Sequence, residues 1–274
     1  GGNYHQAVPA ALSIEIFHNF TLVHDDIMDN APLRRGSVTV HEKWNSNLAI
    51  LGGDAMMILA YQYLQKIPKE LAGQTLQYML ANFNRTAIKV CEGQQMDMNF
   101  ESTESVSLDD YLAMIKRKTA VLLGEALRVG AMMAGAQEED QHLIYDFGKD
   151  FGIGFQIQDD ILDLYGDPEK FGKACGGDIL AGKKSYLYIK ALEKANTQTQ
   201  EKLKETYYST SLSDADKISS VKAIFDELNI KSLAKAEMNR YYLSAGVALN
   251  SIDVEESKKE TLKGFAQSLM VREI

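Results

Sequence analysis

Six aspartates in two clusters are the residues of this sequence most able to do chemistry. Both clusters have the spacing DDxxD, and their members are Asp25, Asp26, Asp29, Asp159, Asp160 and Asp163. Each residue of an α-helix advances by about 100°, so the three carboxylates of a cluster project from one face. In a cleft, two carboxylates about 5 Å apart repel by ~3 kcal/mol at an effective dielectric constant near 20. We therefore expect each cluster to bind cations.

The expected cation is Mg²⁺. All the candidate ligands are carboxylate oxygens with no Cys or His partner in metal-binding spacing, and such hard ligands suit Mg²⁺ better than Zn²⁺. Neither cluster is followed by the glycine and glutamate of an EF-hand loop. A single cluster would more often be a solvated acidic helix face, but this pattern occurs twice in apolar sequence. Because Mg²⁺ bound by few carboxylates completes its coordination with water and phosphate, a phosphorylated substrate is predicted.

Basic residues accompany both clusters. Arg34 and Arg35 follow the first cluster, Lys118 lies in the segment KRKT, and Lys173 and Lys183 lie in a glycine-rich segment after the second cluster. Any one of them alone would more often be a solvated surface charge. Together they suit phosphate groups, because Arg binds phosphate through two parallel hydrogen bonds and Lys binds it as a point charge.

Long helices are expected to position these residues. The 274 residues include only four prolines, and long stretches carry the residue types that favour helices. Helical periodicity and turn signals predict helices over about 9–29, 53–65, 71–100, 108–136, 142–164, 186–195, 200–208, 215–250 and 254–270, with a candidate break near 231–232. The segment after the first cluster is predicted to be a turn, and the glycine-rich segment an extended functional loop. The sequence therefore predicts an all-α protein.

Charge and composition exclude several classes of protein. The formal net charge is -9 and the pI is about 5.1, which is unlike the basic field of a nucleic-acid binder. The most apolar window, 120–136, is interrupted by Glu125 and Arg128, so no membrane span is predicted. The two cysteines lie in neither a zinc-binding nor a disulfide pattern. We therefore expect a reducing, cytoplasmic location.

Four segments resemble, in order, the landmarks of the trans-isoprenyl diphosphate synthases, also called polyprenyl synthetases, of the farnesyl and geranylgeranyl type. They are HNFTLVHDDIMDNAPLRRG, KRKT, FQIQDDILD and GKACGGDILAGKKS, and the resemblance covers about residues 13–185. It implies an all-α isoprenoid synthase (terpenoid synthase) helical bundle around a deep central cavity, with residues 1–274 as one domain, usually in a homodimer. It also implies head-to-tail condensation of isopentenyl diphosphate with an allylic diphosphate, which can be dimethylallyl, geranyl or farnesyl diphosphate.

The resemblance implies a role for each candidate residue. The principal ligands of what are expected to be three Mg²⁺ ions would be Asp25, Asp29 and Asp159. The other aspartates, which would be ligands or would support them, are Asp26, Asp160 and Asp163. The residues implied in binding the allylic diphosphate are Arg34, Lys118 and Lys183, and Lys173 is a further candidate for substrate binding. Those implied in binding isopentenyl diphosphate are Arg35 and His18.

The resemblance also indicates how the reaction and the product length are controlled. Lys118, Thr119 and Gln156 are the implied catalytic residues, the last two turning oxygen dipoles toward an allylic carbocation. In this family, a bulky residue four or five positions before the first aspartate limits the growing chain. Phe20 stands at one of these positions, with Phe17 one turn away. One aromatic floor favours a C20 product, with C15 next, unless both rings are ordinary core residues.

Two alternative functions remain open. A class I terpene cyclase shares the fold but usually pairs one DDxxD with an Asn/Ser/Glu motif, and the second DDILD argues against this alternative. A non-catalytic partner subunit of a synthase is disfavoured by the intact clusters and lysines. The family also has a Gly-Lys-Arg-x-Arg-Pro segment upstream of this region, and none precedes Gly1. The domain is therefore expected to lack its N-terminal segment in this numbering. Either residues upstream of Gly1 lie outside the numbering, or the chain is truncated and half of one substrate site is missing.

Overall fold

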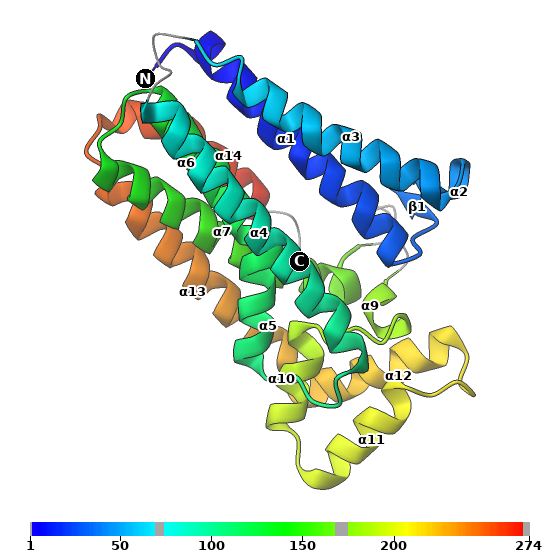
Figure 1. Cartoon of the computed structure of the whole chain (residues 1–274). Coiled ribbons are helices and arrows are strands. Elements are labelled where there is room, and N and C mark those ends of the chain that lie inside the picture. Colours follow the sequence, from blue (N-terminus) through cyan, green and yellow to red (C-terminus); the bar gives the residue numbers. More distant parts are fainter. Residues whose placement is uncertain (1, 69–73, 168–174, 271–274) are drawn as a thin grey trace. The chain divides into compact units, whose positions relative to one another are not determined.

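The computed structural model describes residues 2–68, 74–167 and 175–270 and is built almost entirely of helices (Figure 1). The strands within these residues are the two-residue β1 (Leu33–Arg34) and β2 (Ser37–Val38), which pair antiparallel. The predicted all-α class is therefore confirmed. The chain forms two compact units, residues 1–88 with 124–145, and residues 89–123 with 146–274.

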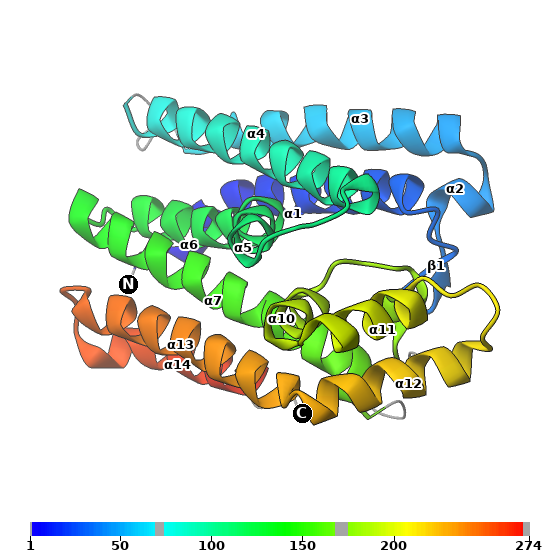
Figure 2. The same cartoon turned by 90° about the horizontal axis from the view of Figure 1, so that it is seen from below.

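The first unit contains the helix that carries the first aspartate cluster. Its elements up to residue 88 are α1 (Tyr4–Met28), the β1–β2 hairpin, α2 (Val40–Lys43), α3 (Ser46–Leu64) and the first part of α4 (Gln74–Ser102), and residues 124–145 add parts of two later helices. The side chain of Asn3 caps α1 by accepting a hydrogen bond from the backbone N–H of His5. α1 and α3 lie side by side (Figures 1 and 2). Gly53 of α3 makes this possible, because a Cβ at this position would collide with the ring of His24.

The remaining helices follow in chain order. They are α5 (Leu108–Ile115), the π-helix η1 (Lys116–Ala120), α6 (Val121–Met133), α7 (Glu138–Tyr165), α9 (Gly177–Leu180), α10 (Tyr186–Lys194), α11 (Thr197–Tyr207), α12 (Asp214–Glu227), α13 (Ile230–Ser251) and α14 (Glu256–Met270). In the second unit, α10, α11 and α12 pack together, in yellow in Figure 1. Ser107 caps α5 by accepting a hydrogen bond from the backbone N–H of Asp110 at 3.1 Å.

The structure differs from the predicted elements in several places. α1 begins at Tyr4 rather than at residue 9, α3 begins at Ser46 rather than at residue 53, and the predicted loop after the second cluster contains α9. The predicted turn after the first cluster contains the β1–β2 hairpin and α2. The predicted helix over 108–136 is interrupted by η1. The helix predicted over 215–250 is broken at Leu228 and Asn229 rather than at 231–232, and Asn229 has a left-handed φ of 55°. Each helix within the described ranges is too short or too polar to cross a lipid bilayer.

Candidate functional site

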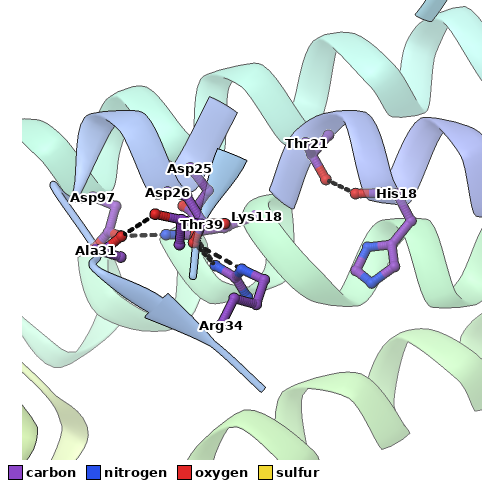
Figure 3. Close-up of polar contacts among 9 residues, drawn as sticks. All are labelled: His18, Thr21, Asp25, Asp26, Ala31, Arg34, Thr39, Asp97 and Lys118. Carbon is purple, nitrogen blue, oxygen red and sulfur yellow. Dashed lines mark hydrogen bonds and ion pairs between the residues drawn. The ribbon is translucent and has the colours of Figure 1, made fainter. Parts of the chain in front are cut away.

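The first aspartate cluster lies at the C-terminal end of α1 and contacts Arg34. Asp26 is buried, Asp25 is partly exposed, and Asp29 is exposed directly after the helix. Arg34 Nε donates a hydrogen bond to Asp26 Oδ1 at 2.7 Å, and Arg34 Nη2 donates to Asp25 Oδ2 at 3.3 Å (Figure 3). These contacts raise the pKa of Arg34, and the hydrogen bond that Arg34 donates to Asp26 is the largest cause. The cluster therefore holds a positive charge, as the crowding of its carboxylates predicts.

The β1–β2 hairpin aims Arg34 at the cluster. Leu33 pairs with Val38 and Arg34 with Ser37, leaving Arg35 and Gly36 as a two-residue loop with φ values of 53° and 76°. Two left-handed residues are the signature of a type I′ hairpin turn. Thr39 closes the segment, because its Oγ1 donates to the carbonyl of Ala31 at 2.7 Å (Figure 3). Arg34 consequently faces the carboxylates while Arg35 is exposed at the tip.

His18 and the two candidate floor residues lie further back on α1. His18 is half-buried, and burial lowers its pKa, with Arg35 and Arg34 adding to the effect and Glu15 opposing it. The neutral imidazole is therefore favoured. Phe17 and Phe20 are buried and their ring centroids are 5.5 Å apart. In the first unit, His18 thus lies close enough to Arg34 and Arg35 for their charges to act on it, and Arg34 contacts the first cluster.

The second cluster lies on α7, and two of its aspartates hold other elements in place. Asp160 is buried, and its Oδ2 accepts hydrogen bonds from Tyr111 Oη at 2.6 Å and from the N–H of Tyr186 at 2.8 Å. Burial is the main cause that raises the pKa of Asp160 to about 6. Asp163 Oδ2 accepts the N–H of Asp178 at 3.1 Å, and Asp159 is exposed. Asp160 therefore anchors α5 and α10, and Asp163 anchors the start of α9.

The three predicted catalytic residues lie on η1 and α7. Lys118 Nζ donates to Asp97 Oδ2 of α4 at 2.5 Å (Figure 3). Thr119 Oγ1 donates to Gln156 Oε1 at 3.4 Å, and Gln156 Nε2 donates to Asp160 Oδ1 at 3.5 Å. These hydrogen bonds link Thr119 through Gln156 to the second cluster. The structure therefore places Thr119 and Gln156 in contact.

Lys183 follows α9 and its backbone is held on both sides. Its N–H donates to the carbonyl of Asp178 at 2.9 Å, and its carbonyl accepts a hydrogen bond from Tyr207 Oη at 2.6 Å. The preceding Gly182 has a left-handed φ of 66°, which favours glycine. Lys173, the other predicted lysine of this segment, lies outside the described residues.

The donor groups fit a hard divalent cation. Within the described ranges, no three His, Cys, Asp or Glu side chains converge as the ligands of one ion would. The six predicted ligands are nonetheless all carboxylates, and the first cluster draws the guanidinium of Arg34. Oxygen donors that attract positive charge are the set that Mg²⁺ prefers.

Sequence analysis missed four residues that form hydrogen bonds with predicted site residues. They contact predicted residues and are Asp97, Tyr111, Asp178 and Tyr207. Asp178 carried a signal, because it directly follows two glycines in the loop after the second cluster. It is buried, and burial followed by repulsion from Asp160 and Asp163 raises its pKa well above the usual value. The two tyrosines carried no signal, because their partners come from distant parts of the sequence.

Comparison with known proteins gives consistent results. The sequence profile of the polyprenyl synthetase family matches residues 1–228. A geranylgeranyl diphosphate synthase of Methanosarcina mazei is 41% identical over 194 residues, 71% of this chain and 59% of the relative. A geranylgeranyl diphosphate synthase of Sulfolobus acidocaldarius is 39% identical over 266 residues, 97% of this chain and 79% of the relative. This chain thus spans less than two thirds of the first of these proteins. Other relatives are named geranylfarnesyl diphosphate synthase.

The solved structures agree with these names. A crystal structure of a geranylgeranyl pyrophosphate synthase matches with a TM-score of 0.93 and 42% identity, over 100% of this chain and 84% of that chain. This match confirms the predicted isoprenoid synthase fold, while the deep central cavity stays a prediction. The names of the relatives favour the predicted prenyltransferase over a terpene cyclase or a non-catalytic subunit.

Proposed function

Because the chain belongs to the polyprenyl synthetase family, we propose that it is a Mg²⁺-dependent trans-prenyltransferase. Its proposed reaction is the head-to-tail condensation of isopentenyl diphosphate with an allylic diphosphate by ionisation, condensation and elimination. The observation that carries this proposal is that the family match over residues 1–228 includes both aspartate clusters. The family generally uses Mg²⁺, which suits the all-carboxylate donor groups of this chain.

The proposed product is geranylgeranyl diphosphate, a C20 chain, with the C15 farnesyl diphosphate as the alternative. Two observations support the longer product. Two relatives that are 41% and 39% identical are named geranylgeranyl diphosphate synthase, while one that is 40% identical is named geranylfarnesyl diphosphate synthase. Phe17 and Phe20 are buried on the helix that ends in the first cluster. The allylic primer can be dimethylallyl, geranyl or farnesyl diphosphate, since each precedes a C20 product in the same series.

The proposed metal ligands are the carboxylates of the two clusters. Asp25, Asp29 and Asp159 would be the principal ligands of three Mg²⁺ ions that bind together with the substrate diphosphate. The partly exposed Asp25 and the exposed Asp29 and Asp159 are accessible for this purpose. Asp160 and Asp163 are bonded to Tyr111, Tyr186 and Asp178, which favours a supporting role, and Asp26 supports Arg34. When bound, Mg²⁺ supplies Lewis-acid neutralisation of the leaving diphosphate.

Cationic side chains are proposed to stabilise the same leaving group. Arg34 lies beside Asp25 and Asp26, so its guanidinium can contact phosphate oxygens bound at this cluster. Lys118 and Lys183 would supply further positive charge, and Lys173 stays a prediction. The negative charge on the bridging oxygen grows as the C–O bond breaks, and preformed cations stabilise it without reorganisation.

Other residues are proposed to act on the second substrate and on the carbocation. Arg35 and His18 would bind isopentenyl diphosphate, since His18 shares its surroundings with Arg34 and Arg35. Gln156 Nε2 donates to Asp160, which leaves its Oε1 on the side of Thr119. Gln156 Oε1 and Thr119 Oγ1 would stabilise the allylic carbocation. The departing diphosphate is the proposed acceptor of the proton that is lost after condensation.

We also propose a homodimer and a single domain. The family match runs through both compact units, which supports residues 1–274 as one polyprenyl synthetase domain. One face of α3 exposes large apolar side chains, among them Leu48, Leu51 and Ile58. An exposed apolar face of this kind suits a second copy of the chain. A cytoplasmic location stays a prediction from the two cysteines of the sequence.

Product analysis tests the proposed function. The protein is incubated with Mg²⁺, labelled isopentenyl diphosphate and each allylic diphosphate in turn, and the dephosphorylated products are separated by chromatography. We expect labelled C20 alcohol, with C15 as the alternative outcome. Cyclic hydrocarbons formed from an allylic diphosphate alone would indicate a cyclase. Absence of elongation from every primer would overturn the proposal.

A further inference from the structure

A row of aromatic rings runs through the first unit away from the first aspartate cluster. It begins at His24, which directly precedes Asp25 in the sequence. The ring centroids are 4.7 Å apart for His24 and Phe20, and 5.5 Å apart for Phe20 and Phe17. Phe17 continues the row to Phe83 at 5.1 Å, and Phe83 to Tyr61 at 5.2 Å. All these residues belong to the first unit, so the row lies within a single compact body.

The ring of Phe83 is held between two others. It meets Phe17 of α1 at an interplanar angle of 70° and Tyr61 of α3 at 87°, which are the favourable edge-to-face arrangements. Tyr61 is itself fixed, because its hydroxyl donates a hydrogen bond to Asn84 Oδ1 at 2.6 Å. Phe17 and Phe83 are each only 1% exposed. Phe83 of α4 therefore packs edge-to-face against the buried ring of Phe17 and holds it in place.

The position of Phe17 on α1 gives this support a consequence for the reaction. Phe17 lies eight residues before Asp25, or about 12 Å along the helix at 1.5 Å per residue. Beyond Phe17, the buried positions of α1 are the small residues Ser13 and Ala10. Under the proposed function, a hydrocarbon chain that grows along α1 from the cluster would meet bulky rings at Phe20 and Phe17, and beyond them the fully buried side chains of α1 are small.

We propose that Phe83 is a specificity-determining residue that sets product length by holding Phe17 in place. This inference rests on the proposed prenyltransferase function and extends it to a helix on which the sequence analysis placed no site residue. The ligand concerned is the apolar tail of the growing allylic diphosphate. Without the ring of Phe83, Phe17 loses its support from α4 and can turn aside, so that the tail extends toward Ser13 and Ala10.

The test compares products of Phe83→Ala, Phe83→Leu and Phe17→Ala. Each full-length variant is incubated with Mg²⁺, isopentenyl diphosphate and farnesyl diphosphate, and the chain lengths are measured by chromatography. Both Phe83 variants are expected to raise the ratio of C25 and longer products to C20 by at least about tenfold, a discrimination typical of small size changes in an apolar pocket. Because Phe83 acts through Phe17, the double variant should resemble Phe17→Ala rather than add the two shifts.

Phe225→Ala is the matched control. Phe225 is also 1% exposed but lies on α12 in the second unit, so its loss should lower stability without changing the product ratio. If Phe83→Ala fails to fold, Phe83→Leu, which keeps an apolar side chain, carries the test. An active Phe83→Leu with the wild-type ratio would overturn the role of Phe83 alone, as would an equal shift in Phe225→Ala. A wild-type protein that elongates no primer would overturn the proposed function as well.

Discussion

Arg34 brings positive charge to the first aspartate cluster through a guanidinium that contacts two carboxylates. Asp26 is almost completely buried while Asp25 keeps some exposure, so the pair with Asp26 is the less screened of the two. Asp25 therefore remains the more accessible carboxylate for a metal ion, and Arg34 stays close enough to contact a bound diphosphate. The same residue would then neutralise the cluster before the substrates bind and the leaving group afterwards.

Replacing Asp25 tests the first metal site. Asp25→Ala should lower kcat about 1000-fold, because a bound metal ion contributes several kcal/mol of charge stabilisation and each 1.4 kcal/mol is a factor of ten. The measurement is the rate of isopentenyl diphosphate incorporation at saturating substrates and Mg²⁺. Asp109→Ala is the control, because Asp109 is exposed in the first turn of α5 and should keep its rate. Near-normal turnover of Asp25→Ala would refute its role as a ligand.

Phe20 is the residue for which the sequence analysis gives the clearest expectation on chain length. Phe20→Ala should lengthen the product beyond C20, because it removes the first bulky ring before the cluster, and product chromatography measures the change. Leu12→Ala is the control on the same helix, because Leu12 is 39% exposed and so lies off the buried face of α1. If Phe20→Ala leaves the product distribution unchanged, the floor lies elsewhere, and Phe17 with Phe83 becomes the place to look.

Among the elements, η1 is one that the sequence could not predict. Periodicity correctly indicates helix from Leu108 onward, but it cannot show the wider π-turn over Lys116–Ala120 that carries Lys118 and Thr119. This segment is closely packed, because α4 passes so near to η1 at Gly93 that a Cβ there would collide with the backbone nitrogen of Lys118. Such a contact joins segments far apart in the sequence, so local patterns do not contain it.

The hairpin that holds Arg34 was also beyond sequence analysis. Turn chemistry correctly placed a turn after the first cluster, but the loop residues Arg35 and Gly36 are not the Asn-Gly or Asp-Gly pair usual in a type I′ turn. By contrast, the two aspartate clusters were recognisable because helix geometry alone puts their carboxylates on one face. What it could not show is that Asp160 is engaged by Tyr111 and the backbone of Tyr186.

The close approach at Gly93 yields a test of the element that carries Lys118. Gly93→Ala should destabilise the protein by about 1–3 kcal/mol, because an added methyl group in a tight contact forces the backbones apart. It should also raise KM for the allylic diphosphate by displacing Lys118. Urea unfolding and steady-state kinetics measure the two effects.

Gly130→Ala is the matched control on α6. A Cβ at Gly130 would meet nothing within 4 Å, so the change should stabilise the helix by about 0.4–1 kcal/mol through the lower entropy of the unfolded chain. If Gly93→Ala were as stable as Gly130→Ala and bound substrate normally, η1 would not depend on the contact with α4.

At the scale of the whole molecule, α3 is a helix whose exposed apolar side chains are not covered by contacts within one chain. α3 packs against α1, its buried positions include the small residues Ala49, Gly53 and Ala60, and Gly53 lies against the ring of His24 of α1. Its other side exposes Leu48, Leu51 and Ile58. A helix that is apolar all round is normally buried. The composition of α3 was visible in the sequence, but which side faces α1 depends on the position of Gly53 against His24.

The proposed homodimer can therefore be tested on the exposed side of α3. Wild-type protein should sediment at about 61 kDa, twice the 30.5 kDa of one chain. Leu51→Asp should raise the dimer dissociation constant at least about 100-fold, because a carboxylate would be buried without a partner in an apolar interface. Leu51 is 64% exposed in the single chain, and Leu243 of α13 is 72% exposed, so Leu243→Asp is the matched control and should remain dimeric. If Leu243→Asp alone dissociates the dimer, the interface lies on α13. If wild-type protein is a monomer at micromolar concentration, it forms no stable dimer, and the exposed side of α3 is solvated in the active protein.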